Sequence, residues 1–382
     1  MIRLLTFTNL YPSEARPRHG IFVEQRLRRL VETGRVRANV VVPVPHPPWS
    51  ARSALPAATV RHGIAVRYCG FPAVRGLTTL WHPRLMARAA RSAVAALRSA
   101  GEIDAIDAHF LYPDGVAAAL LGADFDLPVL MTARGSDVNV ALRERVAGRS
   151  IRWAAGRAAA IIAVSGALRD VMVAQGIPAE RITVLRNGVD LDLFKPGEHA
   201  ALRAELGING LTLLAVGNLV VEKGVDLVLR AFAELPQARL VVIGSGPEAG
   251  PLRALAGTLG VGDRIRWMSP MSQAQLARYY SAVDMTVLGS MREGMPNVVL
   301  ESLACGTPVV ATAVGGTPEV LTDDVAGRLV HERTPGAFAS ACRKVLEVPT
   351  DRLAVREFAR RYGWQAPIAA QISLLERVAG HA

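Results

Sequence analysis

The stretch Glu293-Gly294-Met295-Pro296-Asn297-Val298-Val299-Leu300-Glu301 places two carboxylates eight positions apart, across a Gly/Pro turn and the start of an apolar run. A loop carboxylate followed by one on the opening turns of a helix can face the same ligand. The free backbone N–H groups between them are donors for an anion. Because carboxylates suit sugar hydroxyls and helix-start N–H groups suit phosphates, the stretch indicates a nucleotide-sugar site.

Outward from this stretch, short β-rich apolar runs alternate with longer helical patterns, which predicts parallel sheets with helices on both faces. The strands expected in the C-terminal half are Thr212–Val216, Arg239–Ile243, Ile265–Met268, Met285–Leu288, Val309–Ala311 and Gly327–Val330. The helices expected between them are Val225–Glu234, Pro251–Leu259, Ser272–Ala282, Val298–Ala304, Pro318–Leu321 and Pro335–Val345.

The N-terminal half shows the same alternation. Its expected strands are Ile2–Thr8, Ala38–Pro43, Ala65–Tyr68, Ala105–Ala108, Val129–Thr132, Ala160–Val164 and Ile182–Leu185. Its expected helices are Phe22–Glu32, Arg84–Ala100, Gly115–Leu121, Arg149–Ala158 and Ser165–Gln175. A Pro/Ala-rich loop is expected at 45–58.

The chain has 382 residues, more than one core usually holds, so we predict two domains. We place an N-terminal domain at 1–190 and a nucleotide-sugar-binding domain at 191–362, with a Gly- and Pro-containing linker near 188–197. Ligands of open parallel sheets bind beyond the carboxyl ends of the strands. The fold class is therefore α/β, with two Rossmann-like doubly wound domains facing each other across a cleft.

Composition favours a cytosolic protein. Apolar residues make up 51% of the chain, but no uninterrupted apolar run approaches the ~20 residues of a membrane span. The N-terminus lacks a signal-peptide cleavage pattern and suits a first strand. Three widely spaced cysteines, Cys69, Cys305 and Cys342, indicate buried reduced thiols.

The positive charge is uneven. Residues 1–190 hold 25 Arg and no Lys against 14 acidic residues, while residues 191–382 are balanced. This excess favours peripheral contact with an anionic membrane at its inner face, or with a lipid-diphosphate acceptor. The alternative is a compositional bias toward Arg. We expect no nucleic-acid partner, because no binding motif or aromatic stripe accompanies the arginines.

Three glycine-containing turns follow strands of the second half. In the first, Gly217 permits a tight turn and Lys223 stands where a helix starts, so its charge suits a diphosphate and a departing nucleoside diphosphate. The second, Gly244-Ser245-Gly246, lacks the spacing of a dinucleotide motif and suits a pocket wall. In the third, Gly315-Gly316 is expected to expose backbone N–H groups. A solvated lysine and plain connections are the alternatives.

In the first half, His109 ends a strand and can donate or accept toward a sugar hydroxyl near neutral pH. Gly20 would let the backbone approach a phosphate, and Arg134 ends another strand and adds a cation. A structural histidine and an ordinary turn are the alternatives. Since no His/Cys cluster occurs and neither Asp-x-Asp pair follows a strand, no metal is implied.

Together these motifs resemble glycosyltransferase family 4, a retaining family with the GT-B fold, over nearly the whole chain. The match rests on Glu293…Glu301, Gly217…Lys223-Gly224, Asn187-Gly188-Val189-Asp190, the His109 strand end, Ala304–Val309 and Gly315–Glu319. Trp364 fits the final helix of the family, at 363–382, which returns to the first domain.

The resemblance implies a role for each site residue. Glu301 would hold the ribose, Glu293 would face the donor sugar, and Lys223 would bind the diphosphate. Backbone N–H groups around Met295–Val298, a stretch that also includes Pro296 and Asn297, and near Gly20 would help. His109, Glu293 and Lys223 are the expected catalytic residues, with Gly217, Asn218, Gly294 and Arg134 also binding the donor. The family transfers a sugar with retention, without a bound metal or other cofactor.

Two positions depart from the family pattern. Asn218 stands where many members carry an Arg, and Arg134 stands where many carry a His. Asn218 cannot supply a second cation, so Lys223 would carry more of the charge or Arg292 would substitute. Arg134 would compensate by pairing with phosphate from the opposite wall.

The first interpretation is a hexosyl-type glycosyltransferase of cell-envelope polysaccharide or glycolipid synthesis. It would use a UDP- or GDP-linked sugar and a lipid-linked or glycan acceptor. One alternative is a nucleotide-sugar epimerase or hydrolase of the same fold. Another is a non-catalytic protein that binds a nucleotide sugar or a glycan.

Overall fold

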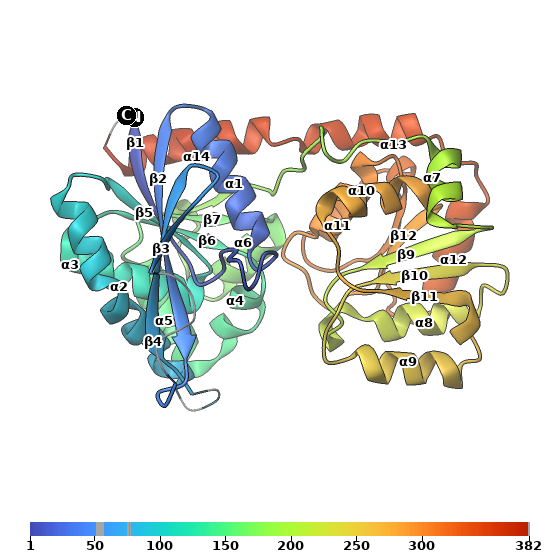
Figure 1. Ribbon diagram of the computed structural model, residues 1–382, viewed down its shortest axis with the longest axis horizontal. Helices are drawn as coiled ribbons and strands as arrows, with labels where there is room; N and C mark the ends of the chain where they lie inside the picture. The colour runs from blue at the N-terminus through green and yellow to red at the C-terminus, as the bar shows by residue number, and fades with distance from the viewer. Residues whose placement is uncertain (51–56, 75, 77, 381–382) are drawn as a thin grey trace. The chain divides into compact units, whose positions relative to one another are not determined.

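The computed structural model describes residues 1–50, 57–74, 76 and 78–380. It divides into two compact units (Figure 1). Unit 1 comprises Met1–Arg186 and Gln365–Ala382, and unit 2 comprises Asn187–Trp364. The domain limits suggested by the sequence, 190/191 and 362/363, lie a few residues from these unit boundaries and stay a prediction of where folding domains end.

Among the described residues, unit 1 holds an eight-stranded sheet in the order β3-β4-β2-β1-β5-β6-β7-β8. All neighbouring strands are parallel except β3 and β4 at one edge. The strands are β1 (Ile2–Phe7), β2 (Val36–His46), β3 (Ala58–Arg61), β4 (Ile64–Pro72), β5 (Ala105–His109), β6 (Val129–Ala133), β7 (Ala160–Ala163) and β8 (Ile182–Val184).

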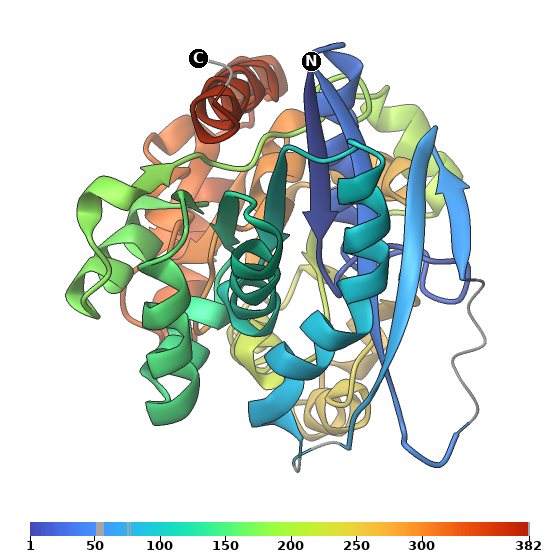
Figure 2. The ribbon, with the colours of Figure 1, turned by 90° about the vertical axis from the view of Figure 1, so that its left-hand side faces the viewer.

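The helices of unit 1 connect these strands. The α-helices are α1 (Ile21–Glu32), α2 (His82–Ser99), α3 (Val116–Phe125), α4 (Ser136–Asn139), α5 (Arg145–Ala155), α6 (Gly166–Ala174) and α14 (Gln365–Val378). Single turns are η1 (Thr79–Trp81), η2 (Leu111–Gly115), η3 (Ala141–Arg143) and η4 (Ala179–Arg181). Helix α14, dark red in Figure 2, lies beside α1 although the two are at opposite ends of the chain.

Unit 2 holds, in the described part of the chain, a six-stranded sheet in the order β11-β10-β9-β12-β13-β14, with all neighbours parallel. Its strands are β9 (Thr212–Val216), β10 (Arg239–Ile243), β11 (Ile265–Met268), β12 (Met285–Leu288), β13 (Val309–Thr312) and β14 (Gly327–Val330).

The helices of unit 2 are α7 (His199–Leu206), α8 (Val225–Ala233), α9 (Ala249–Thr258), α10 (Gln273–Ala282), α11 (Asn297–Ala304), α12 (Pro335–Leu346) and α13 (Arg352–Ala359). Its single turns are η5 (Val221–Lys223), η6 (Gly262–Arg264), η7 (Thr317–Glu319), η8 (Asp324–Ala326) and η9 (Arg360–Tyr362).

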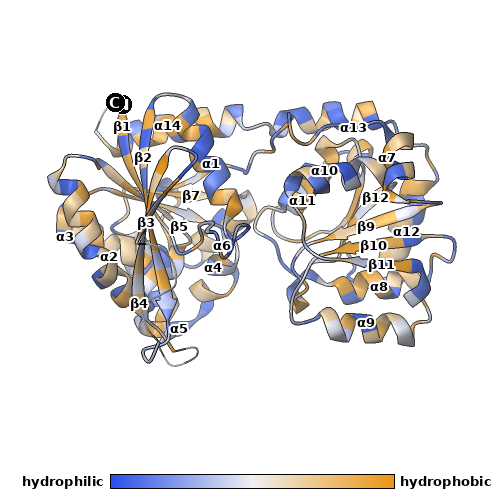
Figure 3. Ribbon diagram, viewed as in Figure 1, coloured by the Kyte–Doolittle hydropathy of each residue, from blue (hydrophilic) through white to orange (hydrophobic). Residues whose placement is uncertain are grey.

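The strands form from short apolar runs, because the side chains on both faces of a parallel sheet are buried under helices. Every residue of β5, β6, β12 and β13 is buried, as expected for strands covered by helices on both sides. Figure 3 shows mostly hydrophobic colour along the central strands of each sheet, whereas the helices carry both hydrophobic and hydrophilic colour. The predicted α/β class, with parallel-sheet Rossmann-like units, is confirmed.

Several elements escaped the sequence prediction. Strand β3 is an antiparallel edge strand of four residues whose Val60 is 70% exposed, so it lacks the buried run that marks the other strands. Helix α7 has no fully buried residue and α4 is a single turn. Helix α13 was also missed, although Val355, Phe358 and Ala359 are buried at helical spacing.

Two smaller expectations need correction. Pro45 and His46 belong to β2, and Ala58 begins β3, so the expected loop at 45–58 is shorter than predicted; its residues 51–56 lie outside the described residues. Of the three cysteines, Cys305 and Cys342 are buried, but Cys69 is only partly buried.

Candidate active site

In unit 2, the predicted residues gather beyond the carboxyl ends of β9 and β12, where parallel sheets bind ligands. Lys223 on η5 and Glu293 after β12 form an ion pair, with 2.6 Å between Nζ and Oε1. Ser290 donates its hydroxyl to the same Oε1 at 2.7 Å. Glu293 is only 8% exposed, so its carboxylate needs these partners. A cation and a carboxylate thus share one edge of the sheet.

A turn after β13 holds the Glu293 loop in place. Gly315 has φ +55°, and a Cβ atom there would lie 2.0 Å from the Glu293 carbonyl oxygen. The Gly316 N–H donates to the Gly294 carbonyl at 3.0 Å. This bond corrects the expectation of an exposed Gly316 N–H group, because the turn uses it to support the neighbouring loop.

We predict that Gly315→Ala destabilises the protein and reduces Glu293-dependent function. The added methyl group would overpack the contact with the Glu293 backbone, which typically costs about 1–3 kcal/mol. Gly260→Ala is the matched control, because Gly260 also has φ +65° but has open space around its Cα. Thermal unfolding should show a clearly larger loss of Tm for Gly315→Ala, and equal losses would contradict this role.

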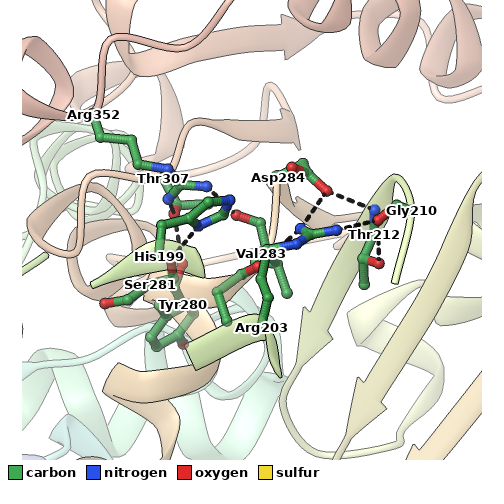
Figure 4. A network of polar contacts seen from close by, with 11 residues as sticks. His199, Arg203, Gly210, Thr212, Tyr280, Ser281, Val283, Asp284, Thr307 and Arg352 are labelled. Atoms are coloured by element: carbon green, nitrogen blue, oxygen red, sulfur yellow. Dashed lines mark hydrogen bonds and ion pairs between the residues drawn. The ribbon is translucent and has the colours of Figure 1, made fainter. Parts of the chain in front are cut away.

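Glu301 lies on the second turn of α11 and accepts a hydrogen bond from the Tyr280 hydroxyl at 3.0 Å. Burial raises the pKa of Glu301 to about 7, against hydrogen bonds from Tyr280 and Gln273 that lower it. Thr307 donates to the Tyr280 carbonyl at 2.5 Å, and Arg352 of α13 donates to Thr307 at 2.7 Å (Figure 4). This network fixes Tyr280 and, through it, Glu301.

Helix α11 begins without a side-chain cap. Its N-cap residue Pro296 makes no capping hydrogen bond, and the Asn297 side chain accepts from Asn187 at 2.9 Å. The backbone N–H groups of Asn297 and Val298, at the start of the helix, therefore have no side-chain acceptor at the N-cap. Helix-start N–H groups of this kind form anion-binding sites. Gly294 and Met295 complete the turn that leads from Glu293 into this helix.

The turn after β9 packs closely against the backbone of the turn after β10. A Cβ atom on Gly244 would lie 1.9 Å from the Gly217 carbonyl oxygen, and one on Gly246 would lie 2.2 Å from the Leu219 carbonyl oxygen. The two glycines of the second turn thus allow backbone contact. Gly217, Asn218 and Lys223 line a small cavity in front of β9 and β12.

The N-terminal candidates meet at the carboxyl ends of β5 and β6 in unit 1. The Arg134 guanidinium donates to Nδ1 of His109 at 2.8 Å, and Nε2 of His109 lies 3.5 Å from Oδ2 of Asp107. Because Arg only donates, Nδ1 is unprotonated and the proton of the neutral ring is on Nε2. His109 is 2% exposed, so its direct contact with a sugar stays a prediction.

The charges of this cluster are interdependent. Burial lowers the pKa of His109, and the cations Arg134 and Arg26 lower it further, against the carboxylate of Asp107. Burial opposes ionisation of Asp107, but His109, Arg26 and Arg134 more than offset it and lower its pKa. Burial also lowers the pKa of Arg134 to about 9. The ground state is therefore a neutral imidazole between a carboxylate and a guanidinium.

Backbone contacts hold the Arg134 turn. Asp137 accepts N–H bonds from Leu111 and Gly135, both at 2.8 Å, and from Arg134 at 3.1 Å. The Arg134 guanidinium lies 5.0 Å from the Phe22 ring on α1. Gly20, which precedes α1, has φ +73°, and a Cβ atom there would lie 2.2 Å from the Leu10 carbonyl oxygen. Packing alone thus requires a glycine, and its phosphate contact stays a prediction.

Asp114 lies on η2, the turn that follows β5. Its side chain is 1% exposed and accepts a hydrogen bond from the backbone N–H of Asn9. Burial raises its pKa to about 8. The folded protein therefore holds the proton more tightly than the unfolded chain, so this group costs stability as pH rises from about 4 to 8.

We expect Asp114→Asn to flatten this dependence. The Tm of the wild type minus that of Asp114→Asn should fall between pH 5 and pH 9, because only the wild type must ionise a buried group. Asp170→Asn, at an exposed acidic residue of unit 1, is the control and should show a constant difference. A difference for Asp114→Asn that rises with pH would contradict the raised pKa.

Two sequence profiles match the chain. One, described as "Glycosyl transferases group 1", matches residues 200–362. The other, described as "Glycosyltransferase Family 4", matches residues 70–193. The chain belongs to glycosyltransferase family 4. The resemblance noted from the motifs is thereby confirmed.

Curated relatives agree with this family 4 assignment. The chain is 37% identical over 222 residues to D-inositol 3-phosphate glycosyltransferase 2 of Catenulispora acidiphila, covering 53% of this chain and 52% of that protein. It is 36% identical over 226 residues to D-inositol 3-phosphate glycosyltransferase of Mycobacterium tuberculosis, covering 56% and 47%. The chain spans about half the length of the curated relatives it matches.

Solved structures place this family 4 chain in the GT-B fold. Sucrose-phosphate synthase from Thermosynechococcus elongatus has a TM-score of 0.83 at 21% identity, covering 99% of each chain. HepE from Anabaena, in complex with UDP and glucose, has a TM-score of 0.76 at 21% identity, covering 98% and 99%. At this identity the likeness concerns the fold.

The two departures from the family pattern have structural contexts. Asn218 and Lys223 line the same small cavity, and Arg292 forms an exposed ion pair with Glu222 at 2.7 Å. Arg292 would have to break this pair to replace the missing cation. In the described residues, no group of three or more His, Cys, Asp or Glu side chains is arranged to hold a metal ion. No described helix has the length and apolar content to cross a membrane.

Sequence reasoning missed several residues of both sites. Ser290 and Tyr280 orient the two carboxylates of unit 2, and Arg26 and Gln371 join the cluster of unit 1. For Arg26 and Gln371, the sequence did contain a signal, which is a polar residue on an otherwise apolar helix face. Gln371 interrupts the buried face of α14, and Arg26 lies on the buried face of α1.

Proposed function

We propose that the chain is a retaining glycosyltransferase that moves a sugar from a nucleoside-diphosphate donor, UDP- or GDP-linked, to an acceptor hydroxyl without a bound metal. The observation that carries this proposal is the Lys223–Glu293 pair at 2.6 Å, at the edge of a parallel sheet and beside the uncapped start of α11. Family membership supports the reaction type.

Each residue has a chemical part in this proposal. Lys223 and the N–H groups at the start of α11 balance the charge of the diphosphate as it departs. Glu301 accepts hydrogen bonds from the ribose hydroxyls, and Glu293 accepts them from the donor sugar. Ligand binding near Glu301 would favour its ionised form, because ribose hydroxyls donate to a carboxylate.

Retention follows from attack on the same face that the diphosphate leaves. The bond between the anomeric carbon and the phosphate oxygen breaks, and a bond to the acceptor oxygen forms. The acceptor proton passes to an oxygen of the departing phosphate, so no dedicated base is needed. His109 and Arg134 would support the donor from unit 1, with Arg134 as the cation that Asn218 does not provide.

We propose a lipid-linked or polysaccharide acceptor of the cell envelope. The names of the relatives favour a second class, a phosphorylated cyclitol such as inositol 3-phosphate. Both classes belong in the acceptor panel. UDP-glucose is the first donor to test, since a protein of the same fold was solved with it.

Membrane contact from the inner, cytoplasmic face is part of this proposal. The positive excess lies in residues 1–190, and Trp49 and Trp81 of unit 1 are 78% and 55% exposed. Trp49 follows the end of β2, and Trp81 lies between β4 and α2. The ends of β2 and β4 are neighbours in the sheet, because His46 pairs with Pro72. Amphipathic tryptophans and arginines together suit a headgroup layer. Binding to anionic vesicles should weaken with salt, and absent or salt-independent binding would favour a soluble acceptor.

The test of the reaction is the anomeric configuration of the product. The protein is incubated with each donor and both acceptor classes, and the new linkage is examined by NMR. A product with the anomeric configuration of the donor supports the proposal, and an inverted product contradicts it. An isomerised or hydrolysed donor without transfer would favour the epimerase or hydrolase. Donor binding without any turnover would favour the binding protein.

A further inference from the structure

Helix α14 carries one polar side chain, Gln371, on the face that it packs into unit 1. Its neighbours on this face, Ile368, Ile372 and Leu375, are buried apolar residues, and Gln371 itself is 0% exposed. Burying an amide without partners is unfavourable. The groups that Gln371 contacts therefore indicate why a polar residue is present here.

Gln371 bridges a cation and an anion. Its Oε1 accepts from Nε of Arg26 at 2.5 Å, and its Nε2 donates to Oδ2 of Asp107 at 3.5 Å. Arg26 only donates and an ionised Asp107 only accepts. An amide satisfies both at once, which neither an apolar residue nor an ionised glutamate can do.

Few other contacts hold the two bridged groups in the described part of unit 1. Nη1 and Nη2 of Arg26 and Oδ1 of Asp107 lack hydrogen-bond partners there, and Arg26 is 1% exposed. Oδ2 of Asp107, the atom that accepts from Gln371, also faces Nε2 of His109 at 3.5 Å. Gln371 and His109 therefore share one oxygen of Asp107, and Gln371 supports the side of this carboxylate that meets His109.

We infer that Gln371 is a positioning residue, which holds Arg26 and Asp107 so that His109 keeps its proton on Nε2 and offers Nδ1 to Arg134. This inference rests on the proposed function, in which Arg134 serves the transfer. Gln371 lies on the segment by which the chain re-enters unit 1 after Trp364. Helix α14 therefore has a role besides packing, because it supplies one residue of the polar cluster that contains His109.

The replacement Gln371→Met removes both polar contacts at similar size. We expect kcat to fall about ten- to hundredfold, the range typical for residues that orient a functional side chain from behind. The KM for the donor should change less than kcat, since Lys223, Glu293 and Glu301 are in unit 2 and only Arg134 would contact the donor from the disturbed cluster. Ser373→Ala, an exposed change on the same helix, is the control and should retain wild-type kcat.

The replacement Gln371→Glu gives a pH signature that a packing role would not produce. Protonated, the carboxyl group can accept from Arg26 and donate to Asp107, as glutamine does; ionised, it cannot donate. Arg26 favours its ionisation, whereas Asp107 and burial oppose it, and His109 and Arg134 lie beyond Asp107. The kcat of Gln371→Glu relative to wild type should therefore rise as pH falls from 9 to 6, while that of Gln371→Met should stay low throughout.

A second readout does not depend on turnover. With ¹⁵N-labelled histidine, the ring signals of His109, assigned with a His109→Asn variant, should show the Nε2–H tautomer in the wild type and in Ser373→Ala, and a disturbed ring in Gln371→Met. Unchanged His109 signals in Gln371→Met, with kcat equal to that of Ser373→Ala, would overturn the inference. If the wild type transfers no sugar, the proposed function fails, and the NMR comparison still decides whether Gln371 positions His109.

Discussion

Replacing Lys223 with alanine should lower kcat by about 10²- to 10³-fold, the usual loss when one stabilising group of a charged transition state is removed. Lys223 is the cation nearest to Glu293, with 2.6 Å between Nζ and Oε1. Asn218 carries no charge, and Arg292 is paired with Glu222. Arg292 is therefore not placed to replace Lys223 without breaking another pair.

The loss should have two parts. The departing diphosphate loses its counter-charge, which slows the chemical step. In addition, Glu293 loses its ion-pair partner but keeps the hydrogen bond from the Ser290 hydroxyl, and a largely buried carboxylate without its ion-pair partner is destabilised. Because of this second effect, thermal stability must be measured beside kcat, and comparison should be made below the Tm of the variant.

The chain offers a matched control, because Lys344 is exposed on α12. The measurement is steady-state release of nucleoside diphosphate from the best donor by the wild type, Lys223→Ala and Lys344→Ala. We expect Lys344→Ala to match the wild type. A Lys223→Ala variant that is folded and retains wild-type kcat would contradict the assignment of the diphosphate site to this loop.

Replacing Arg134 with alanine should cause the second large loss, again about 10²-fold or more in kcat, since it removes the cation that we propose supports the donor. The guanidinium contacts Nδ1 of His109 at 2.8 Å and lies over the Phe22 ring. Its removal takes away both the proposed second cation and the donor that fixes the His109 ring.

The control for this prediction is Arg84→Ala, at an exposed arginine of α2. Arg134→Lys adds a second comparison, because lysine keeps the charge but not the planar fork that pairs with phosphate. We expect Arg134→Lys to lie between the wild type and Arg134→Ala. If Arg134→Ala and Arg84→Ala lose equal activity, Arg134 does not compensate for Asn218.

The strands could be predicted because they are buried on both faces. In unit 2, β9, β10, β11, β12 and β14 begin and end where the apolar runs do. Strand β3 could not be predicted in this way, since it covers one edge and leaves Val60 exposed. Helix α7 likewise has no buried residue that would produce a helical stripe.

The candidate site was predictable where a residue follows a strand directly. His109, Arg134 and the Glu293 loop all stand at carboxyl ends of strands, which the alternation of strands and helices locates. Their partners were not predictable, because contacts between distant segments are set by tertiary packing. Arg26 and Gln371 are separated by 345 positions in the chain. No local spacing indicates that they meet.

The glycines illustrate the same limit. Gly315 and Gly20 were noted as backbone positions suited to anions, and the structure gives each a packing reason. Gly315 meets the backbone of Glu293, twenty-two positions earlier, and Gly20 meets the backbone of Leu10. A motif shows that a glycine is needed, whereas only the fold shows which atoms it must approach.

The most direct test of the donor site is release of free nucleoside diphosphate by the purified protein from a panel of UDP-, GDP- and ADP-sugars. Glu293→Gln serves as the control, because it keeps the size of the side chain but removes the charge that pairs with Lys223. The account predicts slow release from one UDP- or GDP-linked donor and its loss in Glu293→Gln. Release that Glu293→Gln leaves unchanged would contradict a donor site built on Lys223 and Glu293.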